Sequence, residues 1–204
     1  MDANDYHFVT RWRVPGTIEE VGAILGDVNT LAVWWPSVYL GVSELEPGDE
    51  RGVGKLIELH TKGWLPYTLR WRFRVTEVAP PGHIRLDAEG DFVGRGIWTL
   101  ARDGAWTDIA YDWRIRAEKP LLRRLSWLLK PVLSANHHWA MAKGEESLTL
   151  ELARRRAAAQ GAPAAERAAI AAPPGPASLP LGQLALLGAL GLAGLALRRR
   201  IARS

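Results

Sequence analysis

The sequence contains no cysteine, which excludes disulfide bonds and thiolate chemistry and leaves the redox compartment unreported. It also lacks GxSxG, HExxH, P-loop and dinucleotide-binding motifs. The two adjacent histidines, His137 and His138, diverge by about 100° on a helix and cannot easily share a metal. We therefore expect no metal and no cofactor. The opening MDANDYHF has neither a basic nor an apolar stretch, so we expect no Sec-type export of the N-terminus.

Excess charge is absent from most of the chain. The formal net charge is +4, yet residues 1–160 contain 21 Lys and Arg against 21 Asp and Glu. The surplus lies in residues 161–204, which contain five Arg and one Glu. A folded domain without a basic surplus lacks the electrostatic signature of a nucleic-acid-binding protein, so we expect no nucleic-acid partner.

Tryptophan is abundant instead. All ten Trp fall between Trp12 and Trp139. A Trp buries on the order of 150–250 Å² and carries one N–H donor, so such a set can build a core or line an aromatic pocket. Packing is the expected role of most of them.

The first 36 residues predict a strand followed by short helices. Residues 6–14 alternate, with Tyr6, Phe8 and Trp12 on one face, which is the period of a half-buried strand. Pro15-Gly16 ends this strand. Thr17 with Glu20 three residues later has the spacing of a capping box, so a helix is expected from Ile18. A second short helix or turn is expected over residues 27–33, before Trp34-Trp35-Pro36.

Six strands separated by turns follow. The expected ranges are 38–46, 54–61, 66–78, 83–89, 92–101 and 107–116, with Pro/Gly/Asp turns between them. The alternation is clearest in the third, where Trp71 and Phe73 share one face and Arg70, Arg72 and Arg74 share the other. Such a series predicts an antiparallel meander with one apolar face and one face toward water.

Beyond Pro120 the pattern becomes helical. A first piece is expected over Leu121–Lys130, and Pro131 is expected to restart the helix as a first-turn proline. One stripe then recurs at steps of three and four: Leu133, His137, Met141, Gly144, Leu148 and Leu152. The apolar face of the sheet is the surface large enough to receive it. The predicted fold class is α+β: a curved seven-stranded antiparallel sheet wrapped around a long C-terminal helix, with two short helices after the first strand.

This order of elements, with several short motifs, resembles the START-like (SRPBCC, polyketide cyclase/dehydrase and lipid-transport) superfamily, and its small bacterial single-domain members in particular. The resemblance covers about residues 5 to 156. It implies a helix-grip fold with a ligand space between sheet and helix, but the fold alone does not fix a function. The residues that carry it are Trp34-Trp35-Pro36, Gly52-Val53-Gly54, Gly63-Trp64-Leu65-Pro66-Tyr67, Gly90–Gly96, Tyr111-Asp112-Trp113 and Asn136-His137-His138-Trp139.

The C-terminal residues have a different character. We expect a folded domain over residues 1–156, a flexible Ala/Pro-rich linker over 157–178, and a hydrophobic segment with an Arg-rich end over 179–204. Leu179–Leu197 holds 19 residues without a charge. As a helix this segment would be about 28 Å long, close to the roughly 30 Å hydrocarbon core of a bilayer. A single membrane span is the leading interpretation. The alternative is a loosely ordered apolar tail, or one that packs on a partner.

Location and self-association follow from this segment. The Arg cluster at residues 198–200 favours a cytoplasmic C-terminus, whereas the missing export signal favours a cytoplasmic domain. We expect a membrane-anchored protein whose domain is cytoplasmic. Ala185, Ala189 and Ala193 form a small-residue stripe through which two such helices could associate.

Aromatic side chains on the inner face are the main site candidates. Trp71, Phe73, Trp98, Tyr111 and Trp113 are expected on the concave face, while Trp34 and Trp35 fall where the short helices close one end. Met141 and His137 lie on the helix stripe that should face the same space. His137 is the one candidate for catalysis, as a general acid or base, although such a histidine is more often satisfied by a polar neighbour. Glu58 and His60 are expected to face solvent, and Asp112 and Arg114 to form a surface pair.

Three functions remain open at this point. The first is binding or transport of a hydrophobic small molecule, such as a lipid, quinone or polyketide-like compound, which the resemblance implies and an aromatic pocket suits. The second is an aromatase/cyclase or dehydratase acting in the same cavity. The third is a non-catalytic interaction or stress-response module whose cavity is filled by its own Trp side chains. Catalysis is the less favoured expectation.

Overall fold

The computed structural model describes residues 4–177, apart from the side chains of residues 121 and 123–129. The expected membrane segment Leu179–Leu197, with its alanine stripe, lies outside the described residues. Within residues 4–177, no helix combines the length and the apolar character needed to cross a bilayer.

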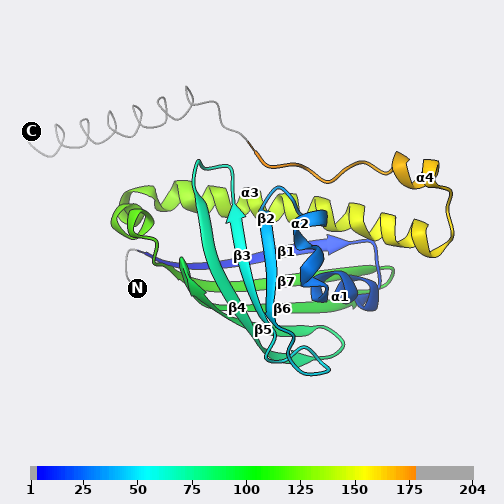
Figure 1. Ribbon diagram of the computed structural model, residues 1–204, viewed down its shortest axis with the longest axis horizontal. Helices are drawn as coiled ribbons and strands as arrows, with labels where there is room; N and C mark the ends of the chain where they lie inside the picture. The colour runs from blue at the N-terminus through cyan, green and yellow to red at the C-terminus, as the bar shows by residue number, and fades with distance from the viewer. Residues whose placement is uncertain (1–3, 178–204) are drawn as a thin grey trace, which may run out of the picture.

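A single antiparallel sheet of seven strands forms the framework, in the order β1-β7-β6-β5-β4-β3-β2. This confirms the predicted meander, and every strand boundary lies within two residues of its predicted position. The sheet curves, and Figure 1 shows α3 lying across it. The strands are β1 (Asp5–Val14), β2 (Tyr39–Glu46), β3 (Leu56–Lys62), β4 (Thr68–Ala79), β5 (His83–Gly90), β6 (Phe92–Asp103) and β7 (Trp106–Ala117).

The predicted capping box starts α1 (Ile18–Gly26). The Thr17 hydroxyl accepts a hydrogen bond from the Glu20 backbone N–H at 3.2 Å, and the Glu20 carboxylate accepts one from the Thr17 N–H at 2.9 Å. A short 3₁₀ turn, η1 (Val28–Thr30), leads into α2 (Leu31–Trp34). These two short helices close one end of the curved sheet (Figure 1).

The long C-terminal helix is continuous, which corrects one prediction. α3 runs from Pro120 to Ala159 with Pro131 inside it, so Pro131 does not restart the helix. A proline within a helix loses one backbone hydrogen bond and bends the axis. Here Leu122 and Leu133 are both buried, so the apolar stripe is anchored on each side of Pro131 and offsets that loss. Figure 1 shows the first turns of α3 bent away from the axis of the rest.

One end of the space between α3 and the sheet is tightly packed. The C-terminal half of α3 packs on β1, α1 and α2. Leu148 and Leu152 are buried there, and so are Trp12 and Val21 on the facing elements. The contact is close at Gly16, where a Cβ would lie 3.3 Å from the Leu152 side chain.

The segment predicted as a linker begins with regular structure. α3 continues to Ala159, and a further short helix, α4, covers Ala164–Ala169. The Arg154 guanidinium donates a hydrogen bond to the backbone carbonyl of Ala171. At least part of residues 157–178 therefore folds back toward α3.

Candidate ligand-binding site

Two adjoining cavities occupy the remainder of the space inside the sheet. The smaller has a volume of about 130 Å³ and the larger about 440 Å³. Ligand pockets in proteins are typically about 300–1,000 Å³, so the larger chamber alone is in the range for a small molecule. The wall that the two chambers share consists of Trp35, Tyr39, Trp71, Tyr111 and Met141.

The smaller chamber lies at the N-terminal end of α3. It is lined by Tyr6 and Phe8 of β1, by Tyr67 of the β3–β4 loop, and by Trp113 of β7. His137 completes it from α3. Strands from both halves of the sheet therefore contribute aromatic rings to one small space.

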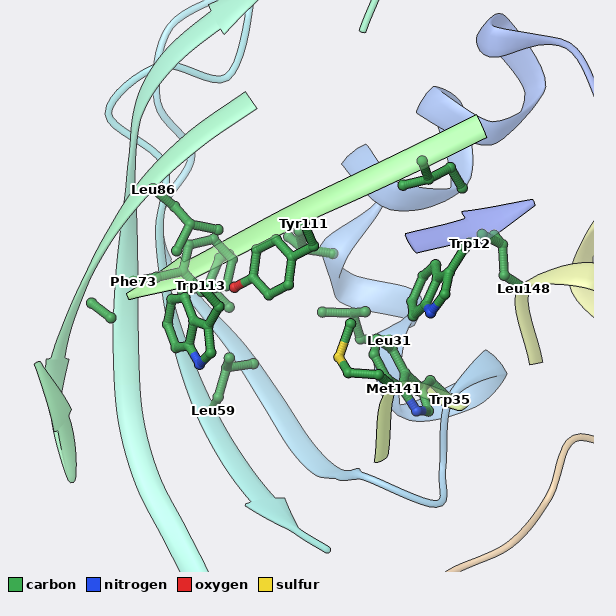
Figure 2. Close-up of a cluster of buried hydrophobic side chains, with 14 of the residues drawn as sticks. Trp12, Leu31, Trp35, Leu59, Phe73, Leu86, Tyr111, Trp113, Met141 and Leu148 are labelled. Atoms are coloured by element: carbon green, nitrogen blue, oxygen red, sulfur yellow. The ribbon is translucent and has the colours of Figure 1, made fainter. Parts of the chain in front are cut away.

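The larger chamber lies between the middle of the sheet and the short helices. Phe73 of β4 and Trp98 of β6 line it from the sheet, and Leu31 of α2 lines it from the opposite side. Figure 2 shows Tyr111, Trp113 and Phe73 gathered on one side of the interior and Trp35 on the other, with Met141 between them.

Two glycines let aromatic side chains reach the shared wall. A Cβ at Gly144 of α3 would lie 2.3 Å from the Trp35 ring, and a Cβ at Gly96 of β6 would lie 2.6 Å from the Tyr111 hydroxyl. Real Cβ atoms do not approach other atoms so closely. The positions of Trp35 and Tyr111 therefore depend on glycine at these two sites.

Ring stacking fixes the sheet side of the cavity. The Trp98 and Tyr111 rings stack with centroids 4.0 Å apart at an angle of 16°, and Tyr111 stacks on Trp113 at 5.5 Å and 20°. Trp71 lies 5.6 Å from Trp113 in a tilted arrangement. Such contacts each contribute about 0.5–1.5 kcal/mol beyond area burial, so this wall is pre-formed rather than assembled around a ligand.

The polar groups of the interior are neutral. Burial raises the pKa of Tyr39, Tyr67 and Tyr111 above the ordinary range, so all three phenols stay protonated at neutral pH. No hydrogen bond of these three hydroxyls is found within residues 4–177. Thr61, by contrast, already accepts a hydrogen bond from the Trp71 indole at 3.0 Å.

His137 is shielded and uncharged. Its ring stacks on Phe8 with centroids 3.9 Å apart at 16°. Burial, and then the neighbouring His138, lowers the pKa of His137 to about 4. Its Nε2 atom is buried and has no hydrogen-bond partner in the described part of the chain. The group could donate or accept one hydrogen bond, but it is a weak base.

The predicted site residues separate into groups. Trp35, Trp71, Tyr111 and Met141 line both chambers. Phe73 and Trp98 line the larger chamber, and Trp113 and His137 line the smaller. Trp34 lines neither, because it is 0% exposed and packs within the core. Its ring stacks on that of Trp35, so one of the two adjacent tryptophans supports the other.

Several lining residues were missed in the sequence. Tyr39, Thr61, Tyr67 and Asn136 all line the cavity. Thr61 extends the inward alternation of Ile57 and Leu59, which was a usable signal. Asn136 gave none, since its carboxamide oxygen accepts a hydrogen bond from the Leu65 N–H at 3.2 Å, a tertiary contact that helical spacing does not show.

Glu58 and the Asp112–Arg114 pair face outward as expected, whereas His60 is less exposed than expected. Glu58 is exposed and His60 is half-buried on the outer face of β3. The Arg114 guanidinium donates two hydrogen bonds to Asp112, at 2.9 and 3.1 Å. On β4, Arg74 pairs with Glu46 of β2. Within residues 4–177, no group of three or more metal-ligating side chains is close enough to hold an ion.

Comparison with known proteins identifies the fold. No family model matches the sequence, and neither does any curated protein. Among solved structures, the Zhui aromatase/cyclase of a Streptomyces species aligns with a TM-score of 0.60 at 19% identity, over 76% of this chain and 98% of that one. A protein of Thermus thermophilus aligns with a TM-score of 0.58 at 18% identity, over 76% of this chain and 99% of that one.

A third similar structure is the di-domain aromatase/cyclase StfQ of the steffimycin biosynthetic pathway. It aligns with a TM-score of 0.55 at 16% identity, over 76% of this chain and 53% of that one. At such identities the likeness concerns the fold alone. The chain has a helix-grip fold, as its sequence predicts, and shares that fold with these two aromatase/cyclases.

Proposed function

We propose that the protein binds and carries a hydrophobic small molecule, a lipid, quinone or polyketide-like compound, in the cavity between the sheet and α3. The observation that carries the proposal is the chemistry of the interior. Its walls are aromatic and aliphatic, and its deep polar groups are all neutral. The charged residues of the lining belong to the β2–β3 loop, residues 47–55, and to Lys62 at the end of β3. Such a site excludes ions and favours apolar ligands.

The phenol hydroxyls support a ligand that also carries a few oxygen atoms. Within residues 4–177 the hydroxyls of Tyr39, Tyr67 and Tyr111 make no hydrogen bond, so each can donate one to a ligand oxygen. The aromatic wall favours a flat molecule that can stack on the ring faces. Because the rings are already stacked on one another, their side chains lose little conformational entropy when a ligand binds. A partly oxygenated ring system suits both features.

Catalysis by a cyclase or dehydratase is the second candidate, and His137 is the observation that favours it. The His137 side chain lines the smaller chamber, and its buried Nε2 has no hydrogen-bond partner in the described part of the chain. Solved relatives of the fold include aromatase/cyclases. A pKa of about 4 makes His137 a poor proton acceptor near neutral pH, so we favour carriage over catalysis.

Extraction of the purified full chain tests the proposal. We expect organic extraction and mass spectrometry to recover a lipophilic molecule near one equivalent per chain. Ile84→Trp should abolish recovery, because Ile84 lines the larger chamber and an indole would fill it. Val9→Trp is the matched control, since Val9 is 54% exposed. If the chain is empty and takes up no fatty acid, quinone or phospholipid, carriage is rejected in favour of a non-catalytic interaction module.

We further propose that Leu179–Leu197 anchors the domain to a membrane, with the domain in the cytoplasm. The support is the sequence: 19 residues without a charge, followed by Arg198-Arg199-Arg200. Removal of residues 179–204 should release the protein from the membrane fraction after cell lysis. A chain that fractionates identically with and without these residues would exclude the anchor, and crosslinking of the anchored form would test association through Ala185, Ala189 and Ala193.

A further inference from the structure

The larger chamber is lined continuously from the solvent to the core. Its outer part is formed by Gly22, Leu25 and Gly26 of α1 on one side and by the β2–β3 loop on the other. Gly26 is exposed, and so are residues 47–51 of the loop. At depth the same chamber is bounded by Tyr111, which is 7% exposed. The chamber therefore meets the surface between α1 and the β2–β3 loop.

The two glycines of α1 border open space. A Cβ at Gly22 or at Gly26 would meet no atom within 4 Å, whereas a Cβ at Gly144 of α3 would strike Trp35. Both α1 glycines have ordinary helical backbone rather than positive φ. Neither close packing nor backbone conformation requires glycine at these two positions. The effect of having glycine there is to leave the space beside α1 open.

The opposite rim of the gap is held by hydrogen bonds. The Asp49 carboxylate accepts from the backbone N–H groups of Arg51 and Val53, both at 2.9 Å. The Asp49 N–H donates to the Val53 carbonyl at 2.8 Å. A loop tied internally in this way is a fixed rim, and the opening does not depend on a flap that swings.

An unpaired polar group at depth points to a ligand on this route. A phenol hydroxyl can donate one hydrogen bond and can also accept one. Tyr111 is more than nine-tenths buried and lines the larger chamber, and its hydroxyl makes no hydrogen bond to another residue within 4–177, so it is available to a ligand. A molecule that entered past α1 would bring its own oxygen to this hydroxyl.

We propose that the gap between α1 and the β2–β3 loop is the entrance of the larger chamber, and that ligand passes Gly22 and Gly26 rather than the smaller chamber. The proposal rests on the proposed ligand-binding function. Asp49, Glu50, Arg51 and Lys55 give the rim charges of both signs. An amphipathic ligand therefore enters with its apolar part first, and its polar end remains at the rim.

The absence of native cysteine makes a reversible block feasible. In the full chain, Gly26→Cys is modified with benzyl methanethiosulfonate, which adds an aromatic group at the rim and is removed by dithiothreitol. Uptake and release of N-phenyl-1-naphthylamine are followed by stopped-flow energy transfer from the tryptophans. The control is Ala23→Cys, modified identically, because Ala23 is exposed on α1 and lies outside the cavity lining.

Modification of Gly26→Cys should slow association and dissociation together, each by about tenfold, and reduction should restore both rates. The dissociation constant should change much less, since a blocked entrance slows both directions. Gly22→Leu should slow both uptake and release of the probe, and dithiothreitol should not restore these rates. Uptake with unchanged rates in the modified protein would overturn the proposed entrance but would leave the proposed ligand-binding function intact. No uptake by the unmodified chain would overturn the ligand-binding function together with the entrance.

Discussion

The two halves of α3 face the same curved sheet, but one half is tightly packed against its neighbours and the other borders cavities. In the C-terminal half, Leu148 is 0% exposed and packs at the closed end beside Trp12, with α1 completing the core. In the preceding turns, His137 and Met141 face Trp71 and Trp113 across open cavities. Both halves belong to one apolar stripe with one spacing.

The difference lies in what stands opposite the stripe. α1 inserts Ile18, Val21 and Ile24 at the closed end, and these three side chains are buried. At the open end Phe8 stacks on His137 of α3, but the rings of Trp71, Tyr111 and Trp113 contact one another and border cavities instead of packing on the helix. An apolar stripe thus predicts which face turns inward, but not whether the space that it faces is filled.

Truncation at matched positions should separate the two halves most strongly. Leu148→Ala removes a fully buried side chain from the closed end and should lower the free energy of unfolding by about 3–5 kcal/mol. Met141→Ala, which borders existing cavity, should cost less, about 2 kcal/mol. Urea unfolding measures both. Equal losses would show that the open half is packed as tightly as the closed one.

His137 should make the open half sensitive to acid. Burial lowers its pKa to about 4 in the folded protein, against about 6.5 in the unfolded chain. The unfolded chain therefore binds a proton first, and stability should fall between about pH 6.5 and pH 4, by on the order of 2 kcal/mol. His137→Phe should remove that slope, measured by urea unfolding at each pH.

The control for this slope is His60→Gln, because His60 lies on the outer face of β3 and is only half-buried. It should leave the slope between pH 6.5 and pH 4 intact. A slope that persists in His137→Phe would place the proton uptake on another group and would contradict the buried, neutral state of His137.

Much of this architecture could be predicted because it is local. The Thr17/Glu20 capping box, the alternation of β4 and the turn at Gly90-Asp91 each depend on a few neighbouring residues. Antiparallel order follows from short turns. Pro131 was misjudged because its effect depends on tertiary packing of the helix on either side of it.

The site was predicted only as a face. Alternation placed Trp71, Phe73 and Tyr111 inward, and all three line the cavity. Trp34 was misplaced since neighbouring residues in a short helix diverge, and only the fold decides which ring of the Trp34-Trp35 pair reaches the space. The cavity itself depends on sheet curvature and on Gly96 and Gly144, whose partners are distant in sequence.

Two glycines within helices should respond oppositely to alanine, one substitution raising stability and the other lowering it. Gly22→Ala adds a Cβ that meets nothing within 4 Å, so helix propensity should stabilise the protein by about 1 kcal/mol. Gly144→Ala adds a Cβ 2.3 Å from the Trp35 ring, and overpacking of about 1–3 kcal/mol should outweigh that gain. Thermal unfolding of both variants checks the signs. Stabilisation by Gly144→Ala would mean that Trp35 moves freely and that the shared wall is soft.

The smallest expected effect belongs to the ion pair that fastens α3 to α1 at the closed end. Arg156 donates two hydrogen bonds to Glu20, at 2.7 and 2.6 Å. These bonds, followed by the bond from the Thr17 backbone, lower the pKa of Glu20 to about 2. A lowered carboxyl pKa stabilises the fold above about pH 4.5, and this contribution is lost as the pH falls toward 2. Because both side chains are partly exposed, the pair should contribute no more than about 1 kcal/mol to the free energy of unfolding.

Glu20→Gln should therefore reduce the loss of unfolding free energy between about pH 4.5 and pH 2. The loss between about pH 6.5 and pH 4, which is due to His137, should stay unchanged. Arg156→Gln should have the same consequence, and the double variant should lose no more than either single variant, because both remove one interaction. Exposed Glu50 provides the control, Glu50→Gln. Two single losses that add fully would indicate that Glu20 and Arg156 act separately, the first through the capping box and the second through a different contact of α3.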